Sequence, residues 1–346
     1  MNMFKVRITI LITIFVFSIA AMIGLYSITE YRRNLPNHFI RKLPPFPITA
    51  DNVKDLRNRQ LYFAGQNGDY FYMGNRYIKN LLFQVDLKTL DTQKVLLKAP
   101  RNFKPLEDAY VEIDSSSLFL IDGIKARIST GSTTDYTLTQ DIVGPYFSVA
   151  VPLSVNSILF RSIGGNNVNV LGKQQVGGRT FVREDLLKKQ IDGVFCTDGI
   201  FLQVPQRNKV FYIYHYRNQF LSLDTNLSLL YKGKTIDTNS LAKIKVGRIK
   251  SSNQVTMAAP PLLVNKQACA NKDYLFIRSA LKADNETDDM HDKATAIDVY
   301  SVNDGKYKLS FYLPEFAGEK LTDFKVYDKM LVALFGHYIY TFKLNF

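Results

Sequence analysis

The sequence predicts an all-β protein, a six-bladed β-propeller of four-stranded antiparallel blades, preceded by one transmembrane helix. Two observations lead to this prediction. One pattern recurs six times along the chain: an alternating strand, a tight polar turn, and then a run of apolar and aromatic residues. The amino terminus instead carries a long uncharged apolar run. Circular repetition of one small sheet explains the first observation, and a membrane span explains the second.

The apolar run covers residues 8–29, which are 22 residues without a charge. As a helix it would be about 33 Å long, enough to cross a hydrocarbon core of ~30 Å. Cleaved signal peptides have apolar regions of only ~7–15 residues, and "SIA" at 18–20 is a poor cleavage site. The sequence therefore favours an uncleaved signal anchor over residues 1–31.

Basic residues flank the anchor almost evenly, with Lys5 and Arg7 before it and Arg32 and Arg33 after it. The positive-inside comparison is therefore nearly balanced, but long domains are translocated largely regardless of charge. We expect a single-pass protein of the cell inner membrane whose folded part lies on the periplasmic, extracytoplasmic side.

Residues 32–50 contain four prolines and no apolar periodicity, which predicts a stiff spacer before a folded domain over residues 51–346. The net charge is +13 for the chain and +8 for residues 51–346, and the basic residues are scattered. Without a Lys/Arg-rich run, a nucleic-acid partner is disfavoured. Anionic lipid or an acidic partner explains the charge better.

The recurring pattern places the second strand of each repeat at similar intervals, 40 to 64 residues apart. These spacings suit four-stranded blades with variable loops. The predicted second strands begin near Tyr70, Leu118, Ile158, Val210, Tyr274 and Met330. The sixth repeat supplies three strands only, so we expect "FPITA" (46–50) to complete it and remove an exposed edge. Only "REDLLKKQ" (183–190) has a helical pattern in this part of the chain.

The stretch "DYLFIRSALKADNE" and the following "AIDVYSVNDGKYKLSFYLP" resemble the six-bladed, TolB-like propellers that bacteria hold at the cell envelope. The resemblance covers about residues 60–345 and rests on a strand pattern, not on a catalytic motif. It implies binding of a partner or ligand on a rigid disc. Fold alone does not assign a function.

The sequence lacks residues and motifs that several functional classes require, which disfavours those classes. The chain has no tryptophan, which WD repeats and quinoprotein propellers use, and it has no GxSxG, HExxH, CxxC or P-loop motif. Two cysteines, Cys196 and Cys269, cannot form a disulfide framework. We expect them to be buried, reduced thiols, with a single bridge between them as the alternative.

The most acidic stretch is "ADNETDDMHD" (283–292), between the second and third strands of the fifth repeat. Asp284, Glu286 and Asp288 match positions 1, 3 and 5 of a calcium loop. The match then fails, because Asp289 replaces the glycine of position 6 and Thr295 the glutamate of position 12. A solvated loop is favoured, so no cofactor is predicted, with Ca²⁺ binding and acid/base chemistry as alternatives. We expect Asp284 and Glu286 to pair with Arg217 or Arg278.

Basic residues occur in the corresponding loops of other repeats, and these loops would open on one end of the disc. Such a ring could recruit an envelope or membrane protein, or a small anionic ligand. The plainer interpretation is that exposed loops often carry Lys or Arg. Candidate binding residues are Arg76, Lys79, Lys125, Arg161, Tyr216, Arg217, Arg278, Asp284 and Glu286.

Taken together, these features favour a membrane-anchored binding or assembly module of an envelope complex over an enzyme. The alternative is a propeller hydrolase, similar to a lactonase, with a divalent metal at its mouth. Such a metal needs acids from several blades, whereas here the acids concentrate in one loop.

Overall fold

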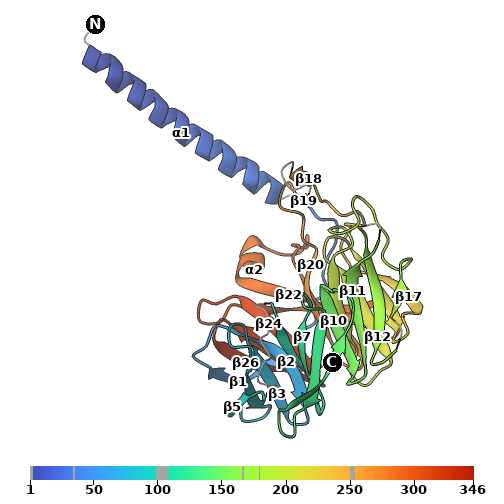
Figure 1. The fold of residues 1–346 in the computed structure, drawn as a ribbon. Helices are drawn as coiled ribbons and strands as arrows, with labels where there is room; N and C mark the ends of the chain where they lie inside the picture. Colours follow the sequence, from blue (N-terminus) through green and yellow to red (C-terminus); the bar gives the residue numbers. More distant parts are fainter. Residues whose placement is uncertain (1–2, 34–35, 99–107, 166, 179, 250–253) are drawn as a thin grey trace.

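The computed structural model describes residues 3–33, 36–98, 108–165, 167–178, 180–249 and 254–346. A single long helix, α1 (Met3–Arg33), projects from a body of β-sheets (Figure 1). Within it, Val6–Ile28 is long and apolar enough to cross a bilayer, with a mean hydropathy of 2.6. None of this span is buried against the rest of the protein, so α1 is available to a membrane.

The body consists of antiparallel sheets, most of which have four strands in up-and-down order. One sheet of eight strands joins two such sets, β2 (Leu61–Asn67), β3 (Tyr70–Asn75), β4 (Leu81–Asp86), β5 (Thr92–Leu96) and β6 (Tyr110–Asp114), β7 (Ser117–Asp122), β8 (Arg127–Ser132), β9 (Leu138–Val143). Three separate four-stranded sheets follow: β10 (Val149–Ser154), β11 (Ser157–Ile163), β12 (Asn169–Gln175), β13 (Phe181–Arg183); β14 (Gly199–Gln203), β15 (Lys209–Tyr214), β16 (Gln219–Asp224), β17 (Leu229–Lys234); and β20 (Asn265–Ala270), β21 (Tyr274–Ser279), β22 (Ala294–Ser301), β23 (Tyr307–Pro314). The last sheet combines β1 (Ile48–Asp55) with β24 (Leu321–Tyr327), β25 (Met330–Phe335) and β26 (Tyr338–Leu344), and β18 (Val246–Ile249) and β19 (Gln254–Met257) form a separate hairpin.

The first strands of successive sheets lie against one another and close into a ring. β10 contacts β14, β14 contacts β20, β20 contacts β24, and β24 contacts β2, while β10 reaches the preceding set through β7. β2 and β6 pair directly and in parallel, Gly65 with Ile113. Gly65 has φ +139°, and a Cβ there would lie 1.8 Å from the Ile113 carbonyl oxygen. Only glycine permits this close approach of the two inner strands.

The ring is closed by the first strand of the chain, because β1 pairs antiparallel with β26, the last strand. Ile48 lies opposite Leu344, and Val53 lies opposite Tyr340. The prediction that residues 46–50 complete the last sheet is therefore confirmed. β1 begins three residues before the predicted start of the folded domain at residue 51 and covers the outer edge of β26.

Middle strands are buried on both faces because the sheets pack face to face, as β15 shows. Phe211 and Ile213 face Leu275 of β21 in one cluster, whereas Tyr212 and Tyr214 lie in the cluster on the other side of the sheet. This explains why the strand has no polar residue at alternate positions.

The predicted helix over residues 183–190 is wrong. β13 ends at Arg183, whose guanidinium pairs with Asp185 at 2.7 Å and fixes a bend there. Leu186 and Leu187 then insert into the cluster around Tyr212, so tertiary burial overrides the local helical preference. The second helix of the described residues is α2 (Asp288–Lys293), within the acidic stretch.

Both cysteines are buried and unbridged, as predicted. Burial raises the pKa of Cys269 to about 12, which suppresses the reactive thiolate. We expect neither thiol to react with a maleimide reagent within minutes under native conditions, and both to react in denaturant, as measured by intact mass. Rapid native labelling of either thiol would contradict this burial.

Candidate functional site at the anchor-side end

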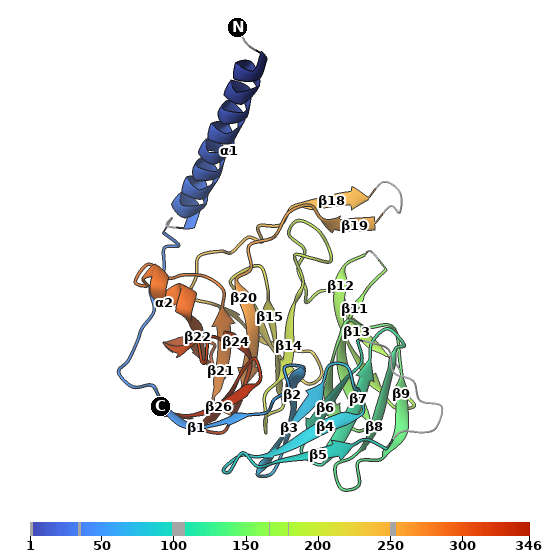
Figure 2. The same ribbon diagram turned by 90° about the vertical axis from the view of Figure 1, so that its left-hand side faces the viewer.

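The turns between the second and third strands of the sheets share one end of the ring, because the sheets have the same connectivity. α2 occupies this turn in the sheet β20–β23 and lies on the side from which α1 departs (Figures 1 and 2). We call this the anchor-side end. It includes the acidic stretch and the turns that supply Arg76, Lys79, Lys125 and Arg217, whereas Arg161 and Arg278, also predicted in loops, lie in strands β11 and β21.

Residues 37–42 do not form a free spacer but dock on the sheet β20–β23, and we call them the anchor clamp. The Asn37 backbone N–H donates to the Asp284 carboxylate and its side-chain amide donates to the Lys282 carbonyl, both at 2.8 Å. The Asp284 N–H returns a bond of 2.9 Å to the Phe39 carbonyl. Phe39 is buried against Leu281 and neighbouring apolar side chains. The segment that follows α1 is thus part of the folded body.

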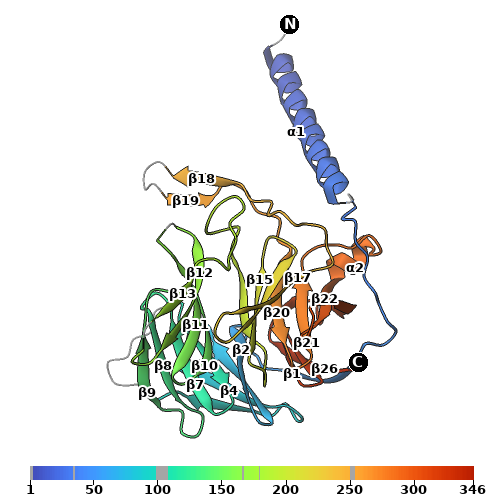
Figure 3. The ribbon, with the colours of Figure 1, turned by 90° about the vertical axis from the view of Figure 1, so that its right-hand side faces the viewer.

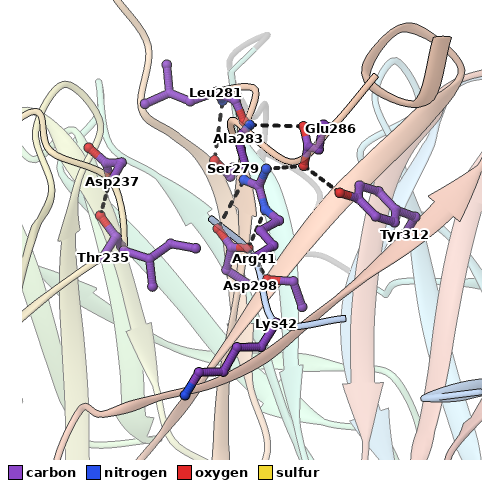
Figure 4. A network of polar contacts seen from close by, with 12 residues as sticks. Arg41, Lys42, Thr235, Asp237, Ser279, Leu281, Ala283, Glu286, Asp298 and Tyr312 are labelled. Carbon is purple, nitrogen blue, oxygen red and sulfur yellow. Dashed lines mark hydrogen bonds and ion pairs between the residues drawn. The ribbon is translucent and has the colours of Figure 1, made fainter. Parts of the chain in front are cut away.

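Arg41 is the centre of the anchor clamp, and its guanidinium is buried between two carboxylates (Figure 4). It pairs with Glu286 from the acidic stretch and, through Nε, with Asp298 of β22 at 2.8 Å. Tyr312 donates to the same Glu286 oxygen at 2.6 Å, and Ser310 donates to Asp298 at 2.5 Å. Each buried charge therefore has an opposite charge and further hydrogen bonds, which is the condition for a stable buried ion pair.

The anchor clamp also makes reciprocal bonds outside the charged pair. The Arg41 N–H donates to the Asn285 side-chain oxygen, and the Asn285 amide donates back to the Arg41 carbonyl, each at 3.0 Å. Lys42 accepts a bond from the Ser310 N–H at 2.8 Å and donates its own N–H to the Tyr307 hydroxyl at 2.9 Å. The backbone of the clamp is therefore fixed along the outer strand β23.

The two charges of this pair stabilise each other's ionised forms. Burial alone would lower the pKa of Arg41, but the charge and hydrogen bonds of Asp298, with the charge of Glu286, raise it above its ordinary value. Burial would likewise raise the pKa of Glu286. The contacts with His291, Arg41, Tyr312 and the backbone outweigh burial and lower that pKa to about 2. Glu286 is therefore ionised at neutral pH.

This lowered pKa predicts how stability depends on pH. Because Glu286 titrates near pH 4.5 when unfolded, its contribution is present above about 4.5 and is lost as the pH falls towards about 2. We expect this group to contribute on the order of 3 kcal/mol to that loss. Urea unfolding at several pH values should show a weaker pH dependence in Glu286→Gln than in the parent. Glu319→Gln, at a partly exposed pair with Arg59, is the control. Equal pH dependences in parent and Glu286→Gln would contradict the prediction.

The acidic stretch is structured rather than a solvated loop. The expected pairing of Glu286 and Asp284 with Arg217 or Arg278 is wrong, because residues of the anchor clamp occupy both carboxylates. Thr287 caps α2 by accepting from the Met290 N–H. The remaining acids make surface contacts: Asp288 pairs with Lys282, Asp289 pairs with Lys293, and the Asp292 carbonyl accepts from Lys320. Among the described residues, no group of three or more His, Cys, Asp or Glu side chains could hold a metal ion.

Three arginines of the predicted basic ring are buried. Arg161 pairs with Asp198 and donates to the Gly199 carbonyl at 3.0 Å. Arg217 lies over the Tyr214 ring at 3.6 Å and donates to the Lys188 carbonyl. Arg278 is 8% exposed, and burial lowers its pKa while the charge of Asp323 raises it. Arg161 and Arg217 therefore have structural partners within the body.

The other candidate binding residues of these turns lie nearer the surface. Arg76 is exposed, with its guanidinium 5.7 Å from the centre of the Tyr62 ring, and Lys125 is exposed in the turn after β7. Lys79 and Tyr216 are half-buried. The turns that carry Arg76 and Lys125 belong to the two sets of strands joined by β2 and β6.

Large apolar side chains accompany these exposed bases. Tyr77 is 70% exposed, and Ile78 and Ile124 are exposed by more than half. We call Arg76, Tyr77, Ile78, Ile124 and Lys125 the rim patch. Aromatic and arginine side chains in an exposed apolar setting are typical of protein interfaces. Sequence reasoning noted the bases of this patch but not the apolar residues beside them.

Sequence reasoning also missed Arg41, Asp298 and Tyr312. A signal for Arg41 was present in "HFIRKL", where Phe39 and Arg41 alternate with exposed residues as in an edge strand. The prolines on either side concealed it. Nothing local marks Asp298 or Tyr312, because their polar atoms have a function only when the clamp is in place.

No family model and no curated protein matches the chain. Solved structures do resemble it at low identity. A member of the duf4221 family from Bacteroides vulgatus has a TM-score of 0.52 at 12% identity, over 86% of this chain and 97% of that one. A putative exported protein from Bacteroides fragilis has a TM-score of 0.52 at 10% identity, over 87% and 96%. BamB from Moraxella catarrhalis has a TM-score of 0.43 at 12% identity, over 86% and 99%. At these identities the likeness concerns the fold, and the ring of four-stranded sheets is a β-propeller.

Proposed function

We propose that this chain is a single-pass membrane protein whose extracytoplasmic, six-bladed β-propeller binds a protein partner at the membrane surface, as an assembly module of the cell envelope. The observation that supports this best is the anchor clamp. A freely tethered disc would present any face to the bilayer, whereas a clamped one presents a fixed face. Fixed orientation is useful to a module that recognises another membrane-bound protein.

The reach of the chain limits how far the propeller can lie from the membrane. From Ile28, the end of the apolar span, α1 continues to Arg33, a rise of about 8 Å. Four residue steps then lead to Asn37, which is hydrogen-bonded to the body, and they span at most ~14 Å. The anchor clamp is therefore held within about 20 Å of the hydrocarbon, at the depth of lipid headgroups and the loops of neighbouring membrane proteins.

The proposed count of six blades takes β2–β5 and β6–β9 as two blades of the eight-stranded sheet. They share one two-residue parallel pairing at the axis, whereas the strands within each set pair over their length. β1 with β24–β26 makes the last blade. Such a disc is rigid, because each blade is packed on both faces.

The rim patch is the proposed contact with the partner. It lies at the anchor-side end, combines exposed apolar area with positive charge, and is supplied by turns from adjacent blades. A membrane protein with an acidic and apolar loop at the bilayer surface would complement it.

Site-specific photocrosslinking in native membranes tests this proposal. A photoreactive phenylalanine at Tyr77 or Ile124 of the full chain is expected to capture the same membrane protein. The same probe at Lys88 or Lys329, exposed in turns at the opposite end, is expected to capture none. Arg76→Glu with Lys125→Glu should reduce capture at Ile124 about tenfold. Capture only from the opposite end, or a mature chain that begins after α1, would overturn the proposal.

A further inference from the structure

Most of the segment between the sheets β14–β17 and β20–β23, residues 238–264, carries no acidic residue. From Thr238 to Lys272 the sequence has no Asp or Glu, although it contains several lysines and an arginine. The acids that neutralise bases elsewhere on this protein are absent here. The segment is therefore a local concentration of positive charge.

The hairpin β18–β19 projects from this segment and combines that charge with exposed apolar side chains. Arg248 lies opposite Val255, and Val246 lies opposite Met257. Because opposite residues of an antiparallel pair share a face, and alternate residues share it too, these four side chains lie on one face. Val255 is 50% exposed, and Val246 and Arg248 are exposed as well, whereas Met257 packs against the cluster around Cys196 at the base of the hairpin. An isolated two-stranded hairpin is marginally stable in water, so a surface that covers this face would stabilise it.

The stem of the hairpin is built on the propeller and on the anchor clamp. Ala242 and Ile244 are buried in a cluster around Cys196, which leaves the alternate residues Lys243 and Lys245 exposed. The Ala258 N–H donates to the Lys245 carbonyl at 2.8 Å and extends the pairing below β18 and β19. The hairpin therefore emerges from a fixed base.

Both ends of the segment touch the anchor clamp. The Thr238 hydroxyl donates to the Asn37 carbonyl at 2.9 Å, and Leu262 packs in the cluster that contains Phe39. The base of the hairpin is therefore subject to the same limit on distance from the bilayer as the clamp. Figures 2 and 3 show β18 and β19 extending across the anchor-side end at the level of the carboxyl end of α1.

We infer that β18–β19 is a second membrane contact, which lies on the bilayer that α1 spans and binds anionic lipid headgroups. This inference rests on the proposed membrane anchor. Val246 and Val255 would enter the interface, and Arg248 on the same face would attract the headgroups. Lys243 and Lys245 lie on the opposite face at the base of the hairpin and would add positive charge near the headgroups. Each base near an anionic surface favours contact by a factor of about five. Charge reversal of all three is therefore expected to weaken contact by at least 100-fold.

The full chain is reconstituted into nanodiscs of phosphatidylcholine with or without one third phosphatidylglycerol. Val255→Cys carries an environment-sensitive fluorophore, since the native thiols are buried. We expect a blue shift and quenching by brominated lipid in the anionic discs, and a much smaller effect in the neutral discs. Lys243→Glu with Lys245→Glu and Arg248→Glu should abolish the signal. The matched charge change at Lys88, Lys306 and Lys329, exposed at the opposite end, should leave it unchanged.

The outcomes separate this inference from the proposed function. If the chain co-elutes with anionic discs but the Val255 label stays in water, the anchor stands and the inference fails. If the chain elutes apart from the discs, the proposed anchor fails and the inference falls with it. A signal that needs an added acidic protein, or one that persists after charge reversal of the hairpin, would also overturn the inference.

Discussion

Replacing Arg41 by methionine is expected to lower the free energy of unfolding by about 3–5 kcal/mol. The reason is not the loss of one attraction but the two carboxylates left behind. Glu286 and Asp298 are buried, and without the guanidinium they keep only hydrogen bonds and, at Glu286, the imidazole of His291 at 3.7 Å. Urea unfolding of parent and variant at neutral pH, followed by tyrosine fluorescence, measures the difference.

The control is Arg59→Met, which also breaks an Arg–Glu pair between distant parts of the chain. Arg59 is exposed and Glu319 is half-buried but reached by solvent, so this loss should be at most about 1 kcal/mol. Adding Glu286→Gln and Asp298→Asn to Arg41→Met should recover part of the lost stability, because the uncompensated charges are removed. An Arg41→Met variant as stable as Arg59→Met would contradict the structural account of the clamp.

Deleting residues 44–52 is expected to lower the midpoint of thermal unfolding by roughly 10 °C or more, given roughly 2–4 °C per kcal/mol for a domain of this size. The deletion removes most of β1, and with it the pairing of Ile48, Thr49 and Ala50 with β26. The core beside β26 loses the cover of Ile48, and the edge of β26 becomes exposed.

A small insertion just before the deleted residues distinguishes the effect of losing strand β1 from the effect of changing the linker that precedes it. Adding Gly-Ser-Gly between Leu43 and Pro44 lengthens the connection from the clamp to β1 but keeps every β1 contact. Loop entropy then costs well under 1 kcal/mol. If the deletion melts like the insertion, β1 does not close the ring.

The fold could be predicted from the sequence because the residues that specify each sheet lie close together in the sequence and the same pattern recurs along the chain. Each hairpin has its own turn, and each middle strand has an apolar run such as "VFYIY" (210–214). The same reasoning also predicted β1, because the last repeat supplies only three strands and needs a fourth to complete its sheet. The hairpin β18–β19 falls between repeats and helix α2 falls in a long turn within one, and this periodicity gives no guidance at either place.

The site was harder to predict because its contacts are long-range. Arg41 and Glu286 are 245 residues apart, and neither occurs in a recognisable motif. Arg217 was wrongly predicted to be an exposed binding residue, because a basic residue in the turn after a strand is usually exposed. Here the guanidinium lies inside the body, over a tyrosine ring and bonded to a backbone carbonyl, while its Nε has no hydrogen-bond partner among the described residues. Long side chains of this kind can be buried wherever their charged end finds acceptors.

The closure of the ring also determines the order in which contacts can form while the chain is translated. β1 and the anchor clamp leave the ribosome directly after α1, but their partners come much later: Glu286 and Asp298 for Arg41, and 338–344 for β1. Throughout translation the nascent chain therefore holds an unpaired strand close to the membrane. A chain truncated before residue 298 can complete neither contact, so it would present an open edge and an uncompensated arginine to the proteases and chaperones that survey membrane proteins.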